Sequence, residues 1–164
     1  QSSKKSFSKG VKTMRRYEII KDEVYQILNT NCFGNKRKHG LEHLFSVAAM
    51  MKYLAIQNNL NIEIAATIGI LHDLATYKLN SSFDHANRSS LIASELLKKD
   101  ELFSANEIDT IVTAIKNHSN KERIDDKYSE LIKNADLLIQ YLNDPEALLT
   151  SEKQKRINRL IESK

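Results

Sequence analysis

Apolar residues recur every three or four positions along most of this sequence, and this spacing is the feature that most restricts the fold. A helix of 3.6 residues per turn places such residues on one face, whereas a half-buried strand requires alternation with a period of two. No run of β-branched and aromatic residues alternates in that way for the length of a strand. A single proline and four glycines leave few helix breakers. We therefore expect an all-α fold.

The breaks in the apolar pattern predict a single compact bundle of about six to seven helices. A chain of 164 residues has the length of one ordinary domain. We expect helices over about 12–28, 41–57, 62–74, 85–98, 104–117 and 129–142, and a last helix that starts at Asp144-Pro145. Ser104 and Glu107 have the spacing of a capping box. The basic segment 1–11 is expected to be a flexible tail, and 12–164 one helical domain.

Composition and charge restrict the class of protein. No apolar stretch approaches the roughly 20 residues of a membrane-spanning helix, so we expect no membrane segment. The single cysteine, Cys32, excludes an internal disulfide, and we expect a reducing, cytoplasmic location. The net charge of +4 comes from basic residues near both ends of the chain, while the middle is acidic. Because basic tails are usually solvated, a nucleic-acid partner is not expected.

Histidines and aspartates occupy positions where the helical pattern calls for apolar side chains. One such histidine alone is more often a core residue with a hydrogen-bond partner, but a buried carboxylate without a partner costs several kcal/mol. Imidazole and carboxylate are the ligands of Mn, Fe, Co, Ni and Zn, and the lack of a cysteine cluster argues against a structural zinc site. The pattern therefore predicts a catalytic metal centre that leaves room for water and substrate. Its candidate ligands are His43, His72, Asp73, His85, His118 and Asp136.

Three segments resemble the signatures of the HD-domain superfamily, an all-helical group of metal-dependent phosphohydrolases. The resemblance covers about residues 35–142. The segments are His43-Leu-Phe-Ser-Val47-Ala48, Leu71-His72-Asp73-Leu74 and Asn134-Ala135-Asp136-Leu137. The segments around His85 and His118 are similar to those that carry the added ligands of the dinuclear branch. By this resemblance one ion has the ligands His43, His72 and Asp136.

The same resemblance implies that His85 and His118 hold a second ion and that Asp73 bridges the two. His85 has the alternative roles of a helix cap or a substrate contact. The implied cofactors are two divalent ions, Mn, Fe, Co or Ni, with Mg and Zn as alternatives. The implied reaction is cleavage of a phosphoester or phosphoanhydride bond, in a nucleotide or dinucleotide, by a hydroxide that the two metals share. Asp73 is then catalytic because it holds the metal pair together.

Three further residues are candidates for contact with the substrate. Many HD hydrolases place a phosphate-binding lysine three residues after the HD aspartate, where this chain has Thr76, and Lys78 or Arg88 are the candidate replacements. Arg88 lies one helical turn from His85, and its forked donors suit a phosphate. His39 lies one turn before His43 and is a candidate general acid or a support for the ligands. A solvated surface position is the alternative for His39 and Arg88.

Two other functions are compatible with the same ligands. Mixed-valent di-iron oxygenases of this superfamily cleave C–C or C–P bonds with O₂, but their last aspartate usually lies much farther from the preceding histidine than the 18 residues between His118 and Asp136. A nucleotide-binding HD module without activity would ordinarily have broken ligands, and here every expected ligand type is present. We therefore favour hydrolysis of a small phosphate compound. The sequence implies no partner chain.

Overall fold

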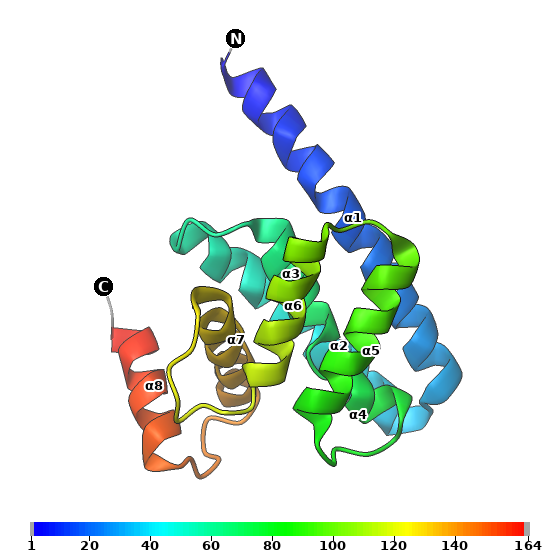
Figure 1. The fold of residues 1–164 in the computed structure, drawn as a ribbon. Helices are drawn as coiled ribbons and strands as arrows, with labels where there is room; N and C mark the ends of the chain where they lie inside the picture. The colour runs from blue at the N-terminus through cyan, green and yellow to red at the C-terminus, as the bar shows by residue number, and fades with distance from the viewer. Residues whose placement is uncertain (1, 163–164) are drawn as a thin grey trace.

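The computed structural model describes the backbone of residues 2–162 and the side chains of residues 14–162, so the side chains of the expected basic tail lie outside the described residues. Eight helices and no strand form over the described backbone, which confirms the all-α expectation (Figure 1). They are α1 Ser2–Asn31, α2 Gly34–Gln57, α3 Ile62–Leu71, α4 Leu74–Lys78, α5 His85–Asp100, α6 Ala105–Asn117, α7 Lys127–Asn143 and α8 Ser151–Glu162. None of these helices combines the length and apolar character that crossing a membrane requires.

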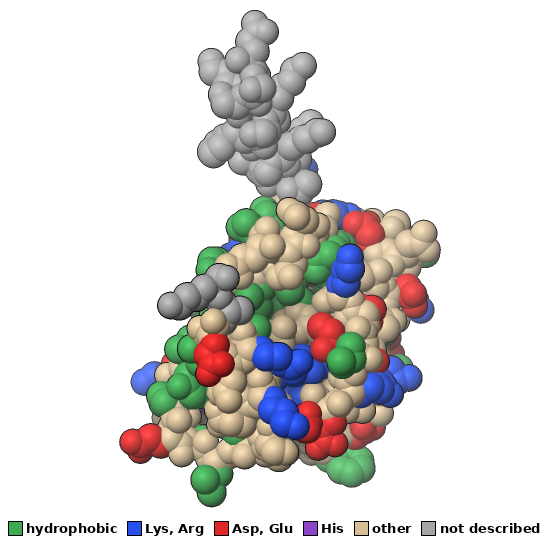
Figure 2. Space-filling view, turned by 90° about the vertical axis from the view of Figure 1, so that its left-hand side faces the viewer, with side chains coloured by type: hydrophobic (Ala, Val, Ile, Leu, Met, Phe, Trp, Pro, Cys, Tyr) green, Lys and Arg blue, Asp and Glu red, His purple; other side chains and the backbone are tan. Residues whose placement is uncertain are grey.

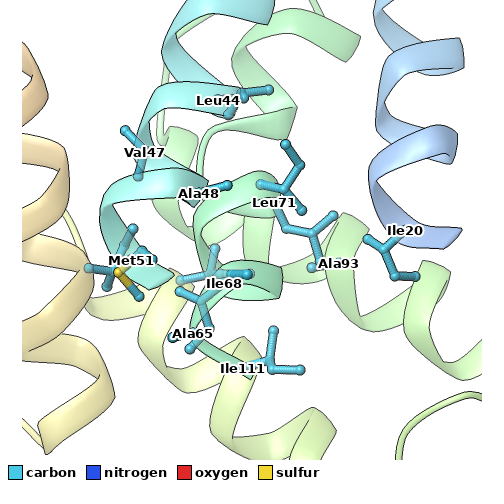
Figure 3. Packing of buried hydrophobic residues seen from close by; sticks show 14 of the residues in the cluster. Ile20, Leu44, Val47, Ala48, Met51, Ala65, Ile68, Leu71, Ala93 and Ile111 are labelled. Carbon is cyan, nitrogen blue, oxygen red and sulfur yellow. The ribbon is translucent and has the colours of Figure 1, made fainter. Parts of the chain in front are cut away.

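The core lies around the pairing of α2 with α3, the most extensive contact between two helices in the described chain. α1 and α6 pack on α3, α7 packs on both central helices, and α5 lies against α6 (Figure 1). The residues at three- and four-residue spacing point into this core, as predicted for amphipathic helices. Figure 3 shows α2 and α3 meeting through Leu44, Val47, Ala48, Met51, Ala65, Ile68 and Leu71.

The start of α6 follows local capping chemistry, whereas other boundaries differ from the expected ones, and α2, for example, begins at Gly34 and not near 41. The expected capping box forms: Ser104 Oγ accepts from the backbone N–H of Glu107, and the Glu107 carboxylate accepts from that of Ser104. The last helix, however, starts at Ser151 and not at Asp144-Pro145. The backbone N–H of Ala147 donates to the Asp144 carbonyl, so this dipeptide begins a turn, a position that proline also suits.

A further correction concerns the residues after α3. The expected helix to about 74 ends earlier, because α3 stops at Leu71 and the backbone of Asp73 leaves the helical region with φ −117° and ψ 18°. A short separate helix, α4, then occupies part of the segment that was expected to be a loop. This break turns Asp73 away from the direction of α3, and it places the His-Asp pair at a junction between two helices.

A buried carboxylate attaches α1 to the centre of the bundle. Glu63, in the first turn of α3, is fully buried and accepts hydrogen bonds from the backbone N–H groups of Arg16 and Tyr17. The Arg16 guanidinium donates to the same carboxylate and also to Glu107 on α6. Charge-assisted bonds of this kind satisfy a buried carboxylate fully. They fix α1 against the start of α3 and α6.

Two carboxyl groups, Glu23 on α1 and Asp100 at the end of α5, make the stability of the contact between these helices sensitive to pH. Burial and the hydrogen-bonded, like-charged Asp100 together raise the pKa of Glu23 to about 7. A carboxyl group with a raised pKa in the folded state holds a proton that the unfolded chain releases at about pH 4.5. Between these two values the folded chain binds more protons, so the free energy of unfolding falls as the pH rises.

We expect the chain to lose about 1 kcal/mol of stability between pH 5.5 and pH 8 through Glu23, after allowance for its partial exposure. Urea unfolding of the wild type and of Glu23→Gln at both pH values measures this difference. The variant should show the smaller loss between the two pH values. Glu95→Gln, an exposed substitution on α5, is the control and should keep the wild-type pH dependence. Equal losses in wild type and Glu23→Gln would contradict the assignment.

Candidate metal centre

The fold brings all six candidate ligands to one place from five helices. His43 lies in the middle of α2, and the His72-Asp73 pair forms the junction between α3 and α4. His85 is the first residue of α5, and His118 caps the C-terminal end of α6. The sixth ligand, Asp136, lies in the middle of α7. Four of the six are buried, and they are His43, His72, His118 and Asp136.

Four of these side chains form a first group around a common point. The Nε2 atom of His43 is 3.2 Å from Asp73 Oδ2 and 3.2 Å from Asp136 Oδ1. The Nε2 atom of His72 is 3.3 Å and 3.4 Å from the same two oxygens, and the two Nε2 atoms are 3.2 Å apart. Ligands that lie about 2.1 Å from one ion at right angles are about 3 Å from each other. The spacing therefore fits the coordination of a single cation.

A second group shares Asp73 with the first. The other oxygen of this carboxylate, Oδ1, is 3.1 Å from His118 Nε2 and 3.6 Å from His85 Nε2. All three donor atoms lie within 4.8 Å of one another. Asp73 thus presents one oxygen to each group, which is the arrangement of a bridging carboxylate. His85 has the most exposed side chain of the set, at 33%, so the second group is the one that opens toward solvent.

Two backbone carbonyls select the tautomer that can bind a cation. The Nδ1 atom of His72 is 2.7 Å from the carbonyl oxygen of Gly69, and that of His118 is 2.6 Å from the carbonyl oxygen of Ile115. A carbonyl only accepts, so both Nδ1 atoms carry a proton, and in the neutral form of each ring the lone pair of Nε2 is directed toward Asp73. A hydrogen bond of this kind at the outer nitrogen is the usual support of a metal-binding histidine.

The charges in the centre favour a cation as well. Burial opposes ionisation of His72, but Asp73 and Asp136 beside it raise its pKa to about 10. The pKa of both carboxyl groups lies well below the ordinary value, because the nearby cationic partners outweigh the effect of burial. One buried and one partly buried carboxylate therefore require positive charge from their surroundings. The donor set of imidazole nitrogens and carboxylate oxygens fits a divalent ion of the Mn to Zn series.

Comparison with known proteins supports what this geometry indicates. The HD domain family matches residues 40–140, a range that includes all six residues. This chain belongs to the HD family. In solved structures, the HD protein resembles the crystal structure of a predicted HD superfamily hydrolase from an uncultured Thermotogales bacterium, with a TM-score of 0.60 and 19% sequence identity. The similarity covers 86% of this chain and 87% of the other, and it shows a shared fold. No curated protein matches the HD chain.

The other candidate residues of the HD protein lie at differing distances from the metal centre. His39 is exposed, and its ring is stacked on that of His43 with 6.2 Å between centroids, so it lies at the edge of the first group. Arg88 lies one turn along α5 from His85, and its Nη1 donates to the carbonyl oxygen of Phe83. Lys78 is exposed at the end of α4, where it lines a cavity of about 500 Å³ between α1 and α5. The lining of that cavity includes none of the metal-ligand candidates.

Two side chains that the sequence patterns did not single out support Asp136. Lys121 Nζ donates to Asp136 Oδ2 at 2.8 Å, and Gln140 Nε2 donates to Asp136 Oδ1 at 3.1 Å. The position of Gln140, four residues after Asp136 on α7, is a signal that helical spacing could have supplied. Lys121 had no such signal, because it lies in the irregular segment between α6 and α7, whose path depends on tertiary contacts.

Proposed function

We propose that this HD domain is a metal-dependent phosphohydrolase that cleaves a phosphoester or phosphoanhydride bond of a small molecule, with nucleotides and dinucleotides as the favoured class. The observation that carries the proposal is the division of the Asp73 carboxylate, with Oδ2 toward His43 and His72 and Oδ1 toward His85 and His118. This division supports two adjacent cation sites rather than one. The second group has fewer protein ligands than the first and includes the exposed His85. This difference supports catalysis, because a structural site would be closed on all sides.

Two divalent cations in this centre would lower the pKa of a shared water and neutralise the charge that develops on the phosphoryl oxygens. The residues of the chain would hold the two cations and orient the donor atoms around them. The imidazoles of His72 and His118 would keep their Nε2 lone pairs toward the centre through the bonds at Nδ1, and Asp73 holds the two groups at a fixed separation. The Lys121 ammonium beside Asp136 holds the pKa of that carboxyl group well below its ordinary value.

The open side of the centre is where the substrate would bind. His85 is the exposed ligand, and Arg88 follows one turn later on the same helix, where its guanidinium would bind a phosphate oxygen through two parallel donors. His39 lies on α2, stacked on His43 and exposed to solvent, where it would donate a proton to the leaving oxygen. Lys78 lines the separate cavity between α1 and α5, so we leave it out of the proposed substrate site.

Metal content tests the proposal directly. Elemental analysis of protein that was purified without chelator or oxygen should find about two Mn, Fe or Co ions per chain. His118→Ala should reduce this to about one, because the second group loses its buried imidazole. His39→Ala is the matched control, since its ring touches the centre without a place in either group, and it should keep both ions.

Phosphate release over a panel of nucleotides and dinucleotides then tests the reaction. The wild type should release phosphate or a nucleoside monophosphate, and His118→Ala should be at least about 100-fold slower. Oxygen consumption is measured beside it. A single ion in both proteins would contradict the dinuclear site, and oxygen uptake without phosphate release would identify an oxygenase instead.

A further inference from the structure

The α6–α7 segment, residues 118–126, is held against the metal centre by three buried cations. Lys121 is 9% exposed, and its Nζ donates to the carbonyl oxygen of His118 at 3.2 Å as well as to Asp136. Lys133 on α7 is fully buried and donates to the carbonyl oxygen of Arg123 at 2.7 Å. Arg156 on α8 donates to the carbonyl oxygen of Lys121 at 3.0 Å. The path of this segment is therefore fixed from both α7 and α8.

Arg156 reaches this segment from a helix outside the part of the chain that matches the HD family. Its side chain is 6% exposed, and Nη1 donates to Asn134 at 2.9 Å and to Glu130 at 3.0 Å. Asn134 lies two residues before Asp136 on α7. The guanidinium therefore connects this part of α7 with Lys121, whose side chain is bonded to the Asp136 carboxylate. Figure 2 shows the face of the molecule turned toward the side on which α8 lies, with Lys and Arg side chains near its middle and no histidine visible. Because Arg156 is buried, the connection from α8 to the residues around Asp136 runs through the interior.

The two oxygens of Asp136 have different partners. Oδ1 faces His43 and His72, whereas Oδ2 is bonded to Lys121 at 2.8 Å. A carboxylate that lacked the second bond could turn about its last torsion and bind one cation with both oxygens, as carboxylates do at larger ions. Such chelation would occupy a position that the proposed reaction needs for water or substrate.

We propose that Lys121 is a positioning residue that restricts Asp136 to one ligand oxygen, and that Arg156 of α8 holds Lys121 in place. The inference rests on the proposed function, since it assumes a cation in the first group. The ammonium also repels a cation, so its loss should not empty the site. The expected effect is a changed coordination at nearly constant occupancy, which a merely structural role of Lys121 would not produce.

The test uses Co²⁺ as the probe, because the visible absorption of this ion reports its coordination number. The metal-free protein, residues 1–164, is titrated with Co²⁺, and the spectrum and the number of ions per chain are recorded. Lys121→Met should retain about two ions while its absorption per bound ion falls by about twofold, because a higher coordination number weakens the bands. Lys121→Arg retains a donor and should keep the wild-type spectrum.

Substitutions on α8 test the second half of the inference. Arg156→Met should change the Co²⁺ spectrum in the same direction as Lys121→Met, and the double variant should add little to either single change, because both act on Asp136. Arg159→Met, on the exposed face of the same helix, should leave the spectrum unchanged. Circular dichroism verifies that each variant is folded.

The outcomes separate this inference from the proposed function. A wild type that binds two ions beside a Lys121→Met variant with an unchanged spectrum and only a lower melting temperature would overturn the inference alone. If Arg156→Met leaves the spectrum unchanged while Lys121→Met alters it, the role of α8 is wrong. A wild type that binds no Co²⁺ would contradict the proposed function together with this inference.

Discussion

Asp73→Asn should remove both cations from the protein and lower phosphate release by about 1,000-fold or more. Asp73 contributes one oxygen to each group of ligands, at 3.2 Å from His43 and 3.1 Å from His118, and in the described part of the chain it is the only residue that belongs to both. An asparagine keeps the size of the side chain but loses the negative charge, and its amide nitrogen is a donor that cannot bind a cation. Elemental analysis and the phosphate assay measure the two effects.

Asp84→Asn provides the matched control for this substitution. Asp84 is exposed, directly precedes His85, and belongs to neither group of ligands. Its φ of 47° lies in the left-handed region, which asparagine tolerates as well as aspartate does. The control should keep two ions and its activity. An Asp73→Asn protein that still holds two ions would show that the carboxylate does not bridge them.

Gly69→Ala should lower the free energy of unfolding by about 3 kcal/mol. A Cβ atom at Gly69 would lie 2.8 Å from the Cα atom of Ala48 and 3.1 Å from its backbone nitrogen. Both neighbours are backbone atoms of α2, so α2 and α3 would have to separate, and a rotamer change could not relieve the contact. The loss is large because total stabilities are about 5–15 kcal/mol. Urea unfolding followed by circular dichroism measures it.

The same substitution should also disturb the metal centre. The carbonyl oxygen of Gly69 accepts the bond that orients His72, and α2 carries His43. Separation of the two helices would therefore move the two imidazoles apart and weaken cation binding. Gly34→Ala is the control: Gly34 has open space around its Cβ position but a φ of +55°, so we expect a loss of only about 1 kcal/mol. If Gly69→Ala costs no more than Gly34→Ala, the close approach of the helices is not important for stability.

Much of the fold followed from the sequence because helices are local structures. The spacing of apolar residues and the caps are properties of neighbouring positions, and they predicted the central part of each main helix and the capping box at Ser104. Boundaries that depend on contacts with distant residues were less predictable. The dipeptide Asp144-Pro145 suits both a helix start and a turn, and only packing selects the turn.

Some features of the candidate site were likewise determined by the sequence, and others only by the tertiary structure. The sequence by itself determined that four of the six ligands, His43, His72, His118 and Asp136, are set inward, because a polar residue on an apolar face is visible without any tertiary information. It also determined the type of chemistry, since imidazole and carboxylate restrict the cation. The grouping of these donors was implied by the family resemblance, but only the tertiary structure provides their distances and directs each oxygen of Asp73 to a different pair of histidines.

The buried side chains that support the metal ligands could be identified only from the tertiary structure. Lys121 and Arg156 are ordinary basic residues in the sequence, and a buried cation is identified only when its distant acceptors are known. The physical reason is that desolvation and hydrogen bonding act between atoms that are close in space. Helical periodicity, in contrast, relates only residues that are close along the chain.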